Sequence, residues 1–79
     1  MLSAVLRVDG PFSEAVADSV GPEAGREIPR TAARVSRRGS ETVIEVTASD
    51  VSAMRAALNS YLECIKVIED VHRLAEVRR

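Results

Sequence analysis

The last third of the chain has the hydrophobic periodicity of one long amphipathic helix, over residues 49–77. Advancing about 100° per residue places its apolar side chains on one contiguous side that spans roughly 180°. These are Val51, Ala53, Met54, Ala57, Leu58, Tyr61, Leu62, Cys64, Ile65, Ile68 and Val71. A single packed interface needs a stripe only somewhat wider than about 100°. The helix therefore carries more apolar surface than its own sheet can cover.

The length of this helix also indicates that its apolar surface exceeds what the sheet can cover. About 27 helical residues extend roughly 40 Å, whereas a six-residue strand extends about 20 Å. The last turns, which hold Ile68, Val71 and Leu74, would then lie in water in an isolated monomer, at about 1.5–3 kcal/mol each relative to burial. This predicts a partner. The alternative is that the first helix folds back over these turns, or that the tail frays.

Composition limits the class of protein. The 79 residues are expected to form one domain over residues 1–79, a size at which oligomerisation commonly supplements the core. One cysteine and one histidine exclude an intramolecular disulfide and make a structural zinc site implausible, so no metal or cofactor is expected. No signal sequence or membrane-spanning stretch is recognisable, which predicts a soluble, cytoplasmic protein without a membrane partner.

The order of elements predicts a two-layer α+β domain of the β-α-β-β-α type. Residues 2–8 alternate as a half-buried strand, and a short helix follows at residues 13–20, with Ser13 as its N-cap and Gly21-Pro22 as its stop. Two more strands surround a hairpin at Gly39. A right-handed crossover gives a three-stranded antiparallel-type sheet of order 1-3-2, with both helices on one face.

No set of residues in the sequence is arranged for catalysis, so an enzyme is not expected. Cys64 lies on the apolar side of the long helix, where a thiol behaves as a small hydrophobe. The net charge of −1 does not favour nucleic acid, yet Arg34, Arg37 and Arg38 crowd the predicted hairpin. They predict an accessory phosphate-binding surface, and the alternative function is a small RNA-binding module that acts through this hairpin.

The segment Arg55-Ala56-Ala57-Leu58-Asn59-Ser60-Tyr61 resembles the helix signature of the small Pcc-type subunit of the KEOPS (EKC) complex. The strand Ile44-Glu45-Val46 and the Ser49-Asp50 cap also resemble the lead-in that is usual in this family. The resemblance implies a non-catalytic scaffold subunit that supports threonylcarbamoyladenosine modification of tRNA. It further implies that the chain forms a homodimer, binds the Kae-type catalytic subunit, and contacts tRNA weakly or indirectly.

If the chain is such a subunit, the two edges of the apolar side of the long helix, which we call its margins, are expected to make two different contacts. Leu58, Leu62 and Ile65 form one margin and are expected to face the chain's own sheet. The other margin is expected to meet a second copy or the catalytic subunit, and the predicted interface residues are Ala53, Ala57, Tyr61, Cys64, Ile68 and Val71. On the polar side, Arg55, Asn59 and Lys66 are either surface residues or polar contacts to a subunit or tRNA.

Overall fold

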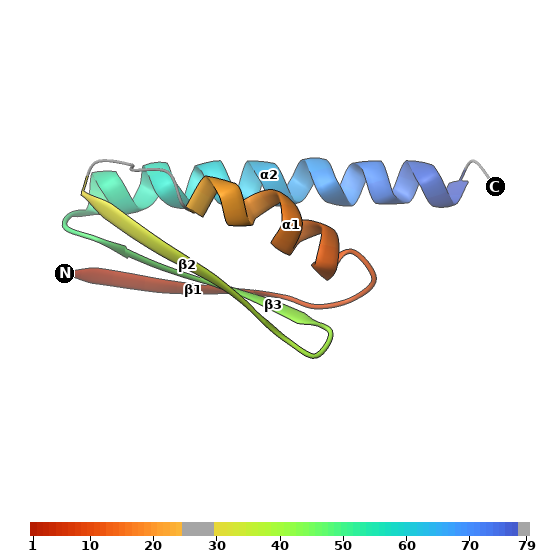
Figure 1. The fold of residues 1–79 in the computed structure, drawn as a ribbon. Coiled ribbons are helices and arrows are strands. Elements are labelled where there is room, and N and C mark those ends of the chain that lie inside the picture. Colours follow the sequence, from red (N-terminus) through yellow and green to blue (C-terminus); the bar gives the residue numbers. More distant parts are fainter. Residues whose placement is uncertain (25–29, 78–79) are drawn as a thin grey trace.

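The computed structural model describes residues 1–24 and 30–77. Its elements are β1 (Leu2–Val8), α1 (Ser13–Ala24), β2 (Thr31–Arg38), β3 (Glu41–Ala48) and α2 (Val51–Val77). The strands form one antiparallel sheet of order β1-β3-β2, and both helices lie on the same side of it (Figure 1). The predicted β-α-β-β-α order and the predicted sheet order are therefore confirmed.

The hairpin between β2 and β3 turns in two residues, Gly39 and Ser40. Gly39 has a φ of +60°, whereas Ser40 does not have a positive φ. A positive φ at the first loop position alone is the pattern of a type II′ turn, which matches the twist of paired strands and favours glycine there. The predicted hairpin at Gly39 is confirmed.

The core lies between the inner face of the sheet and the two helices. The central strand β3 supplies Ile44, Val46 and Ala48, which are almost fully buried. α1 contributes Val16 and Val20, while α2 contributes Ala53, Met54, Ala57 and Tyr61. Because the sheet is short and β3 is its centre, the first half of α2 lies over the core.

A polar network joins the start of α1 to the hairpin, and it revises the role of Ser13. The Ser13 hydroxyl donates to the carbonyl oxygen of Ser40 at 2.6 Å, and the buried Thr42 hydroxyl donates to the carbonyl of Ser13 at 2.7 Å. Arg37 Nη1 donates to both hydroxyl oxygens, at 3.5 and 3.3 Å, and its Nη2 donates to the carbonyl of Gly39 at 3.1 Å. The prediction that Ser13 caps α1 is wrong, because its hydroxyl bonds to the hairpin instead of to the first turn.

The predicted end of α1 at Val20 is also wrong, since the helix continues to Ala24. Proline has no backbone N–H, so Pro22 cannot donate the intrahelical hydrogen bond to the carbonyl of Asp18. It stands only two residues before the end of the helix. One interrupted bond in the last turn costs less than a break in the middle of a helix, and α1 can therefore pass through Gly21-Pro22.

The start of α2 is fixed by Asp50. Its Oδ1 accepts a hydrogen bond from the backbone N–H of Ala53 at 2.8 Å, which is the geometry of an N-cap and confirms the predicted cap. Asp50 Oδ2 also pairs with Arg30 Nη1 at 2.9 Å. Arg30 has an unusual positive φ of 64°, and its carbonyl accepts a hydrogen bond from the N–H of Ser49. These contacts tie the beginning of β2 to the beginning of α2.

α2 is longer than the sheet beneath it. It has 27 residues, and its second half continues past the hairpin end of the sheet (Figure 1). The molecule is accordingly elongated, with principal extents of 45 × 23 × 17 Å. Within the described residues, neither helix has the length and apolar content needed to cross a bilayer. The second half of α2 packs on one side against α1 and Phe12, and this leaves its flanks open.

Candidate partner interface

The side of α2 that faces the sheet is occupied by the chain's own core. Ala53, Ala57 and Tyr61 are only 5%, 1% and 2% exposed. These three side chains were predicted to meet a partner, yet almost none of their surface remains to be covered. Small residues at positions 53 and 57 instead allow α2 to approach the sheet closely. Cys64 and Ile68 are half-buried and pack against the edge of this core.

One flank of α2 is apolar and exposed on the side of α1. We call it the α1-side flank, and it consists of Val67, Val71 and Leu74, each about 60% exposed. Val67 and Val71 also line a groove of about 380 Å³ between the two helices, together with Ala15, Ser19, Ile68 and His72. Of the predicted interface residues, Val71 is thus the one that lies fully on an open apolar surface.

The opposite flank of α2 is apolar as well. We call it the β1-side flank, and it consists of Val51, Leu58, Leu62 and Ile65. Val51 and Leu62 are 63% and 49% exposed, while Leu58 and Ile65 are half-buried against the core. The margin that was expected to face the sheet therefore reaches the core through Leu58 and Ile65 but not through Leu62. Both flanks, and not one margin, are therefore open to partners.

Val67 and Leu74 were not among the predicted interface residues. In the sequence Val67 stands among charged residues, beside Lys66 and near Glu69 and Asp70. Its spacing to Val71 and Leu74 is four and then three residues, and this spacing places all three on one flank. That periodicity was available in the sequence and would have identified the α1-side flank.

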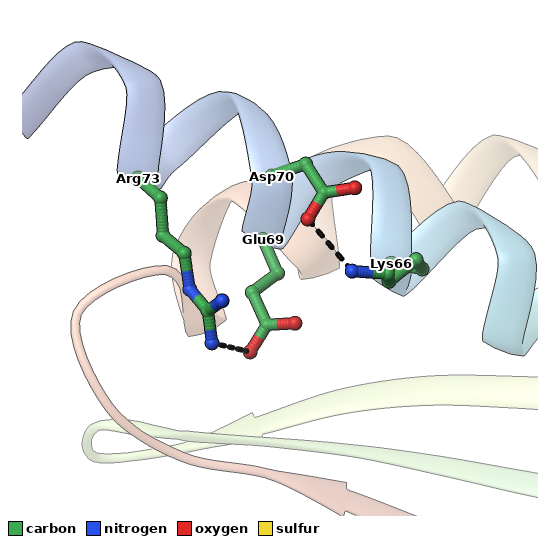
Figure 2. A network of polar contacts seen from close by, with 4 residues as sticks. All are labelled: Lys66, Glu69, Asp70 and Arg73. Carbon is green, nitrogen blue, oxygen red and sulfur yellow. Dashed lines mark hydrogen bonds and ion pairs between the residues drawn. The ribbon is translucent and has the colours of Figure 1, made fainter. Parts of the chain in front are cut away.

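The outer side of α2 carries the polar candidates Arg55, Asn59 and Lys66, all exposed. Asn59 and Lys66 line one shallow hollow of about 430 Å³, which also involves Leu62, Glu63 and Val67. Lys66 Nζ pairs with Asp70 Oδ1 at 2.8 Å, and Arg73 Nη2 pairs with Glu69 Oε2 at 3.3 Å, as Figure 2 shows. These exposed pairs at i,i+4 spacing stabilise the overhanging part of the helix by a few tenths of a kcal/mol each.

The structure separates the three arginines of the hairpin. Arg37 directs its guanidinium to Ser13, Thr42 and the carbonyl of Gly39, so it serves the fold. Arg34 and Arg38 are exposed and form no hydrogen bond or ion pair within the part of the chain that is described. Arg34 lies on the outer face of the sheet, opposite Glu45 of β3 in the ladder. The predicted basic surface is therefore reduced to two arginines.

Residues 1–24 and 30–77 contain no group of three or more His, Cys, Asp or Glu side chains placed to hold a metal ion. His72 packs its ring against Phe12, with ring centroids 6.0 Å apart, and Cys64 is a half-buried free thiol. What the described surface does offer is apolar area along both flanks of a single exposed helix.

Comparison with known proteins relates the chain to one family. A family model described as "Transcription factor Pcc1" matches residues 3–73 of the chain. The chain belongs to the Pcc1 family. This match spans all five elements except the first residue of β1 and the last turn of α2. The family resemblance predicted from the Arg55–Tyr61 segment is therefore confirmed.

One relative carries a more specific name. It is the "KEOPS complex subunit Pcc1" of Pyrococcus abyssi (strain GE5 / Orsay), which is 48% identical to this chain over 46 residues. The aligned region covers 56% of this chain and 56% of the relative. The chain thus aligns with little more than half of the length of that curated protein.

Proposed function

We propose that the chain is a non-catalytic scaffold subunit of a KEOPS-type complex. In this role it forms a dimer and binds the Kae-type catalytic subunit, and it thereby supports threonylcarbamoyladenosine modification of tRNA. The observation that carries the proposal is the exposed α1-side flank on the overhanging half of α2, in a chain that belongs to the Pcc1 family. The name of the Pyrococcus abyssi relative supports membership of such a complex.

The α1-side flank is the surface that we assign to the catalytic subunit. Val67, Val71 and Leu74 retain about 60% exposure each, and the groove beside them lies between α1 and α2. A helix of the partner placed along this groove would contact small side chains, Ala15 and Ser19, on one wall. Covering the three exposed side chains would contribute about 1–2 kcal/mol each to the binding free energy.

Co-expression tests the proposal. The chain is co-expressed with the Kae-type catalytic subunit of the same organism, and the purified material is measured by light scattering. We expect a stable complex that contains two copies of this chain. A monomer that does not associate with the catalytic subunit would refute the scaffold role.

A pair of variants tests the assigned surface. Val71→Lys introduces a charge on the α1-side flank, and Val51→Lys introduces the same charge at a position of similar exposure on the other flank. We expect Val71→Lys to weaken binding of the catalytic subunit by at least tenfold, and Val51→Lys to leave that binding unchanged. Equal effects of the two variants would contradict the assignment of this flank.

The alternative function, a small RNA-binding module, now depends on Arg34 and Arg38, since Arg37 is engaged within the fold. It predicts that the isolated chain binds tRNA, and that the affinity falls steeply as salt is raised, because phosphate contacts release counterions. Binding that is absent in the isolated chain and present only with the catalytic subunit would favour the scaffold role over this alternative.

A further inference from the structure

We propose that the free edge of β2 binds an extended, acidic segment of another protein, which adds to the sheet as a further strand. β2 is an outer strand in the order β1-β3-β2, so one of its two edges is not paired with β3 (Figure 1). We call this edge the β2 edge. The inference goes beyond the proposed function, and the β2 edge shares no residue with the α1-side flank.

The β2 edge presents backbone groups that are open to a further strand. In a hairpin with a two-residue loop, the residues that flank the loop form a hydrogen-bonded pair, here Arg38 and Glu41, and such pairs alternate along the ladder. Ala33, Val35 and Arg37 occupy the other positions, so their N–H and C=O groups point away from β3. Within the described residues, no backbone hydrogen bond outside the ladder involves these three residues. Each of them offers one donor and one acceptor to an added strand.

The outer face of β2 carries positive charge that is not neutralised. Arg34 and Arg38 are exposed, form no ion pair within the described residues, and lie four residues apart, or about 13 Å along the strand. Glu45 and Glu41 are opposite them on β3, but Glu41 pairs with Arg7 at 3.1 Å. Two carboxylates at the same four-residue spacing on an added strand would therefore meet both arginines.

The inner face of the β2 edge is apolar. Ala33 and Val35 are half-buried and pack against the core. α1, which packs against β2, carries the small residues Ala17 and Gly21 on the side turned away from the groove between the helices. A Cβ atom at Gly21 would meet no atom within 4 Å, so this side of α1 is open. Valine side chains of an added strand would thus cover Ala33 and Val35 on the inner face.

A second copy of β2 is a poor occupant of this edge. β2 contains three arginines and no acidic residue, so two such strands side by side would double the positive charge without compensation. An antiparallel register centred on Ser36 would place Arg34 directly opposite Arg38 of the second copy, and like charges at such positions are destabilising. The arginines therefore disfavour the chain itself and favour an acidic strand, which is a combination that gives specificity.

RNA is the other polyanion that two exposed arginines would attract. Sheets that recognise RNA stack its bases on aromatic side chains, and none of the residues of β1, β2 and β3 is aromatic. RNA would also leave the backbone groups of Ala33, Val35 and Arg37 without a matching ladder. A protein strand satisfies the backbone groups and the two arginines together, and this mode of binding is known as β-augmentation.

Peptide binding, measured by fluorescence anisotropy, tests the proposal. The probe is a short peptide in which valines alternate with polar residues, and in which two glutamates lie four positions apart on the polar side. One control peptide has lysines in place of the glutamates, and a second has the glutamates three positions apart, which puts them on opposite faces of the strand. We expect the probe to bind at least about fivefold more tightly than either control. Equal binding of the three peptides would overturn the proposal.

A charge reversal on the protein provides the matching variant. Arg34→Glu is expected to weaken binding of the glutamate peptide by about fivefold and to strengthen binding of the lysine peptide by a similar factor. Arg55→Glu, on the outer side of α2, changes the net charge equally and should alter neither affinity. Both positions are exposed, and circular dichroism checks that both variants are folded. If Arg34→Glu binds both peptides as the parent does, Arg34 does not face an added strand and the proposal is refuted.

Amide hydrogen exchange separates strand addition from attraction between charges alone. On peptide binding, the N–H groups of Ala33, Val35 and Arg37 should become protected, whereas those of Arg34 and Ser36 already bond to β3 and should change little. A glutamate peptide that is N-methylated at alternate residues keeps its charges but cannot donate these bonds, and it should not bind. Binding without new protection would overturn the proposal, as would tighter binding of an oligouridine than of the glutamate peptide.

The outcomes for the proposed function are separate. Arg34→Glu should still associate with the catalytic subunit, because Arg34 lies outside the α1-side flank. A chain that binds the glutamate peptide at the β2 edge and yet does not associate with the catalytic subunit would support the edge assignment and refute the scaffold role alone.

Discussion

Substitution of Ala57 by arginine distinguishes a buried position on α2 from an exposed one. Ala57 is one of the residues predicted from the sequence to lie at a partner interface, where an arginine would block assembly and leave the domain folded. In the structure Ala57 is 1% exposed and belongs to the cluster that contains Ile44 and Val46. A guanidinium at this position has no room and no partner. We therefore expect Ala57→Arg to unfold the domain itself.

The magnitude follows from burial. Overpacking costs about 1–3 kcal/mol, and an unpaired buried charge costs several kcal/mol more, for a total on the order of 5 kcal/mol. A domain of 79 residues has a stability of about 4–12 kcal/mol at the usual value per residue. Ala57→Arg should therefore lower Tm by at least about 20 °C or remove the cooperative transition.

The matched control is Val71→Arg, on the α1-side flank. Val71 is 60% exposed, so the arginine can extend into water and the stability should change by no more than about 0.5 kcal/mol. Thermal unfolding followed by circular dichroism, at one fixed protein concentration, measures both variants. An Ala57→Arg variant that melts within a few degrees of the parent would refute the placement of Ala57 in the core.

Three further predictions concern the polar contacts. Arg37→Ala should destabilise the domain by about 1–3 kcal/mol in urea unfolding, because one hydrogen bond from the hairpin to α1 and two within the hairpin are lost. An unchanged midpoint would contradict the network. Asp50→Ala should lower the free energy of unfolding by about 0.5–2 kcal/mol, because the α2 cap is lost. Asp50→Asn should recover most of this loss, since an amide oxygen can still cap the helix. Equal losses of stability in the two variants would assign the effect to the Arg30 ion pair instead. Asp70→Asn should change stability by less than about 0.5 kcal/mol, and a larger loss would mean that the exposed Lys66 pair matters more than its geometry indicates.

Local patterns were sufficient to predict most of the fold. The alternation in residues 2–8 identified β1, the glycine at position 39 identified the hairpin, and the handedness of the crossover identified the central strand. The strand and the hairpin are recognisable from residues that are adjacent in the sequence, and the sheet order follows from the right-handedness of crossover connections. Asp50 was likewise recognisable as a cap because its partner, Ala53, is three residues away.

The errors came from contacts between distant residues. The hydroxyl of Ser13 bonds to Ser40, which is 27 residues further along the chain, and no local rule anticipates this choice. Likewise, a helical wheel shows which residues of α2 are apolar, but the arc that faces the sheet depends on where α1 packs. The interface prediction placed the partner contact on α2, and three of its residues, Ala53, Ala57 and Tyr61, lie on the arc that the chain itself covers.

The overhang of α2 has a consequence for the local stability of the helix. Its first half shares the core of the domain, so backbone amides there should exchange with solvent only through global unfolding. The last turns are held by α1 on one side and by the exposed Lys66 and Glu69 ion pairs, so they should open locally at much lower free energy. A partner bound along this half would suppress that opening. Hydrogen exchange at the end of α2 is thus a direct reporter of partner occupancy.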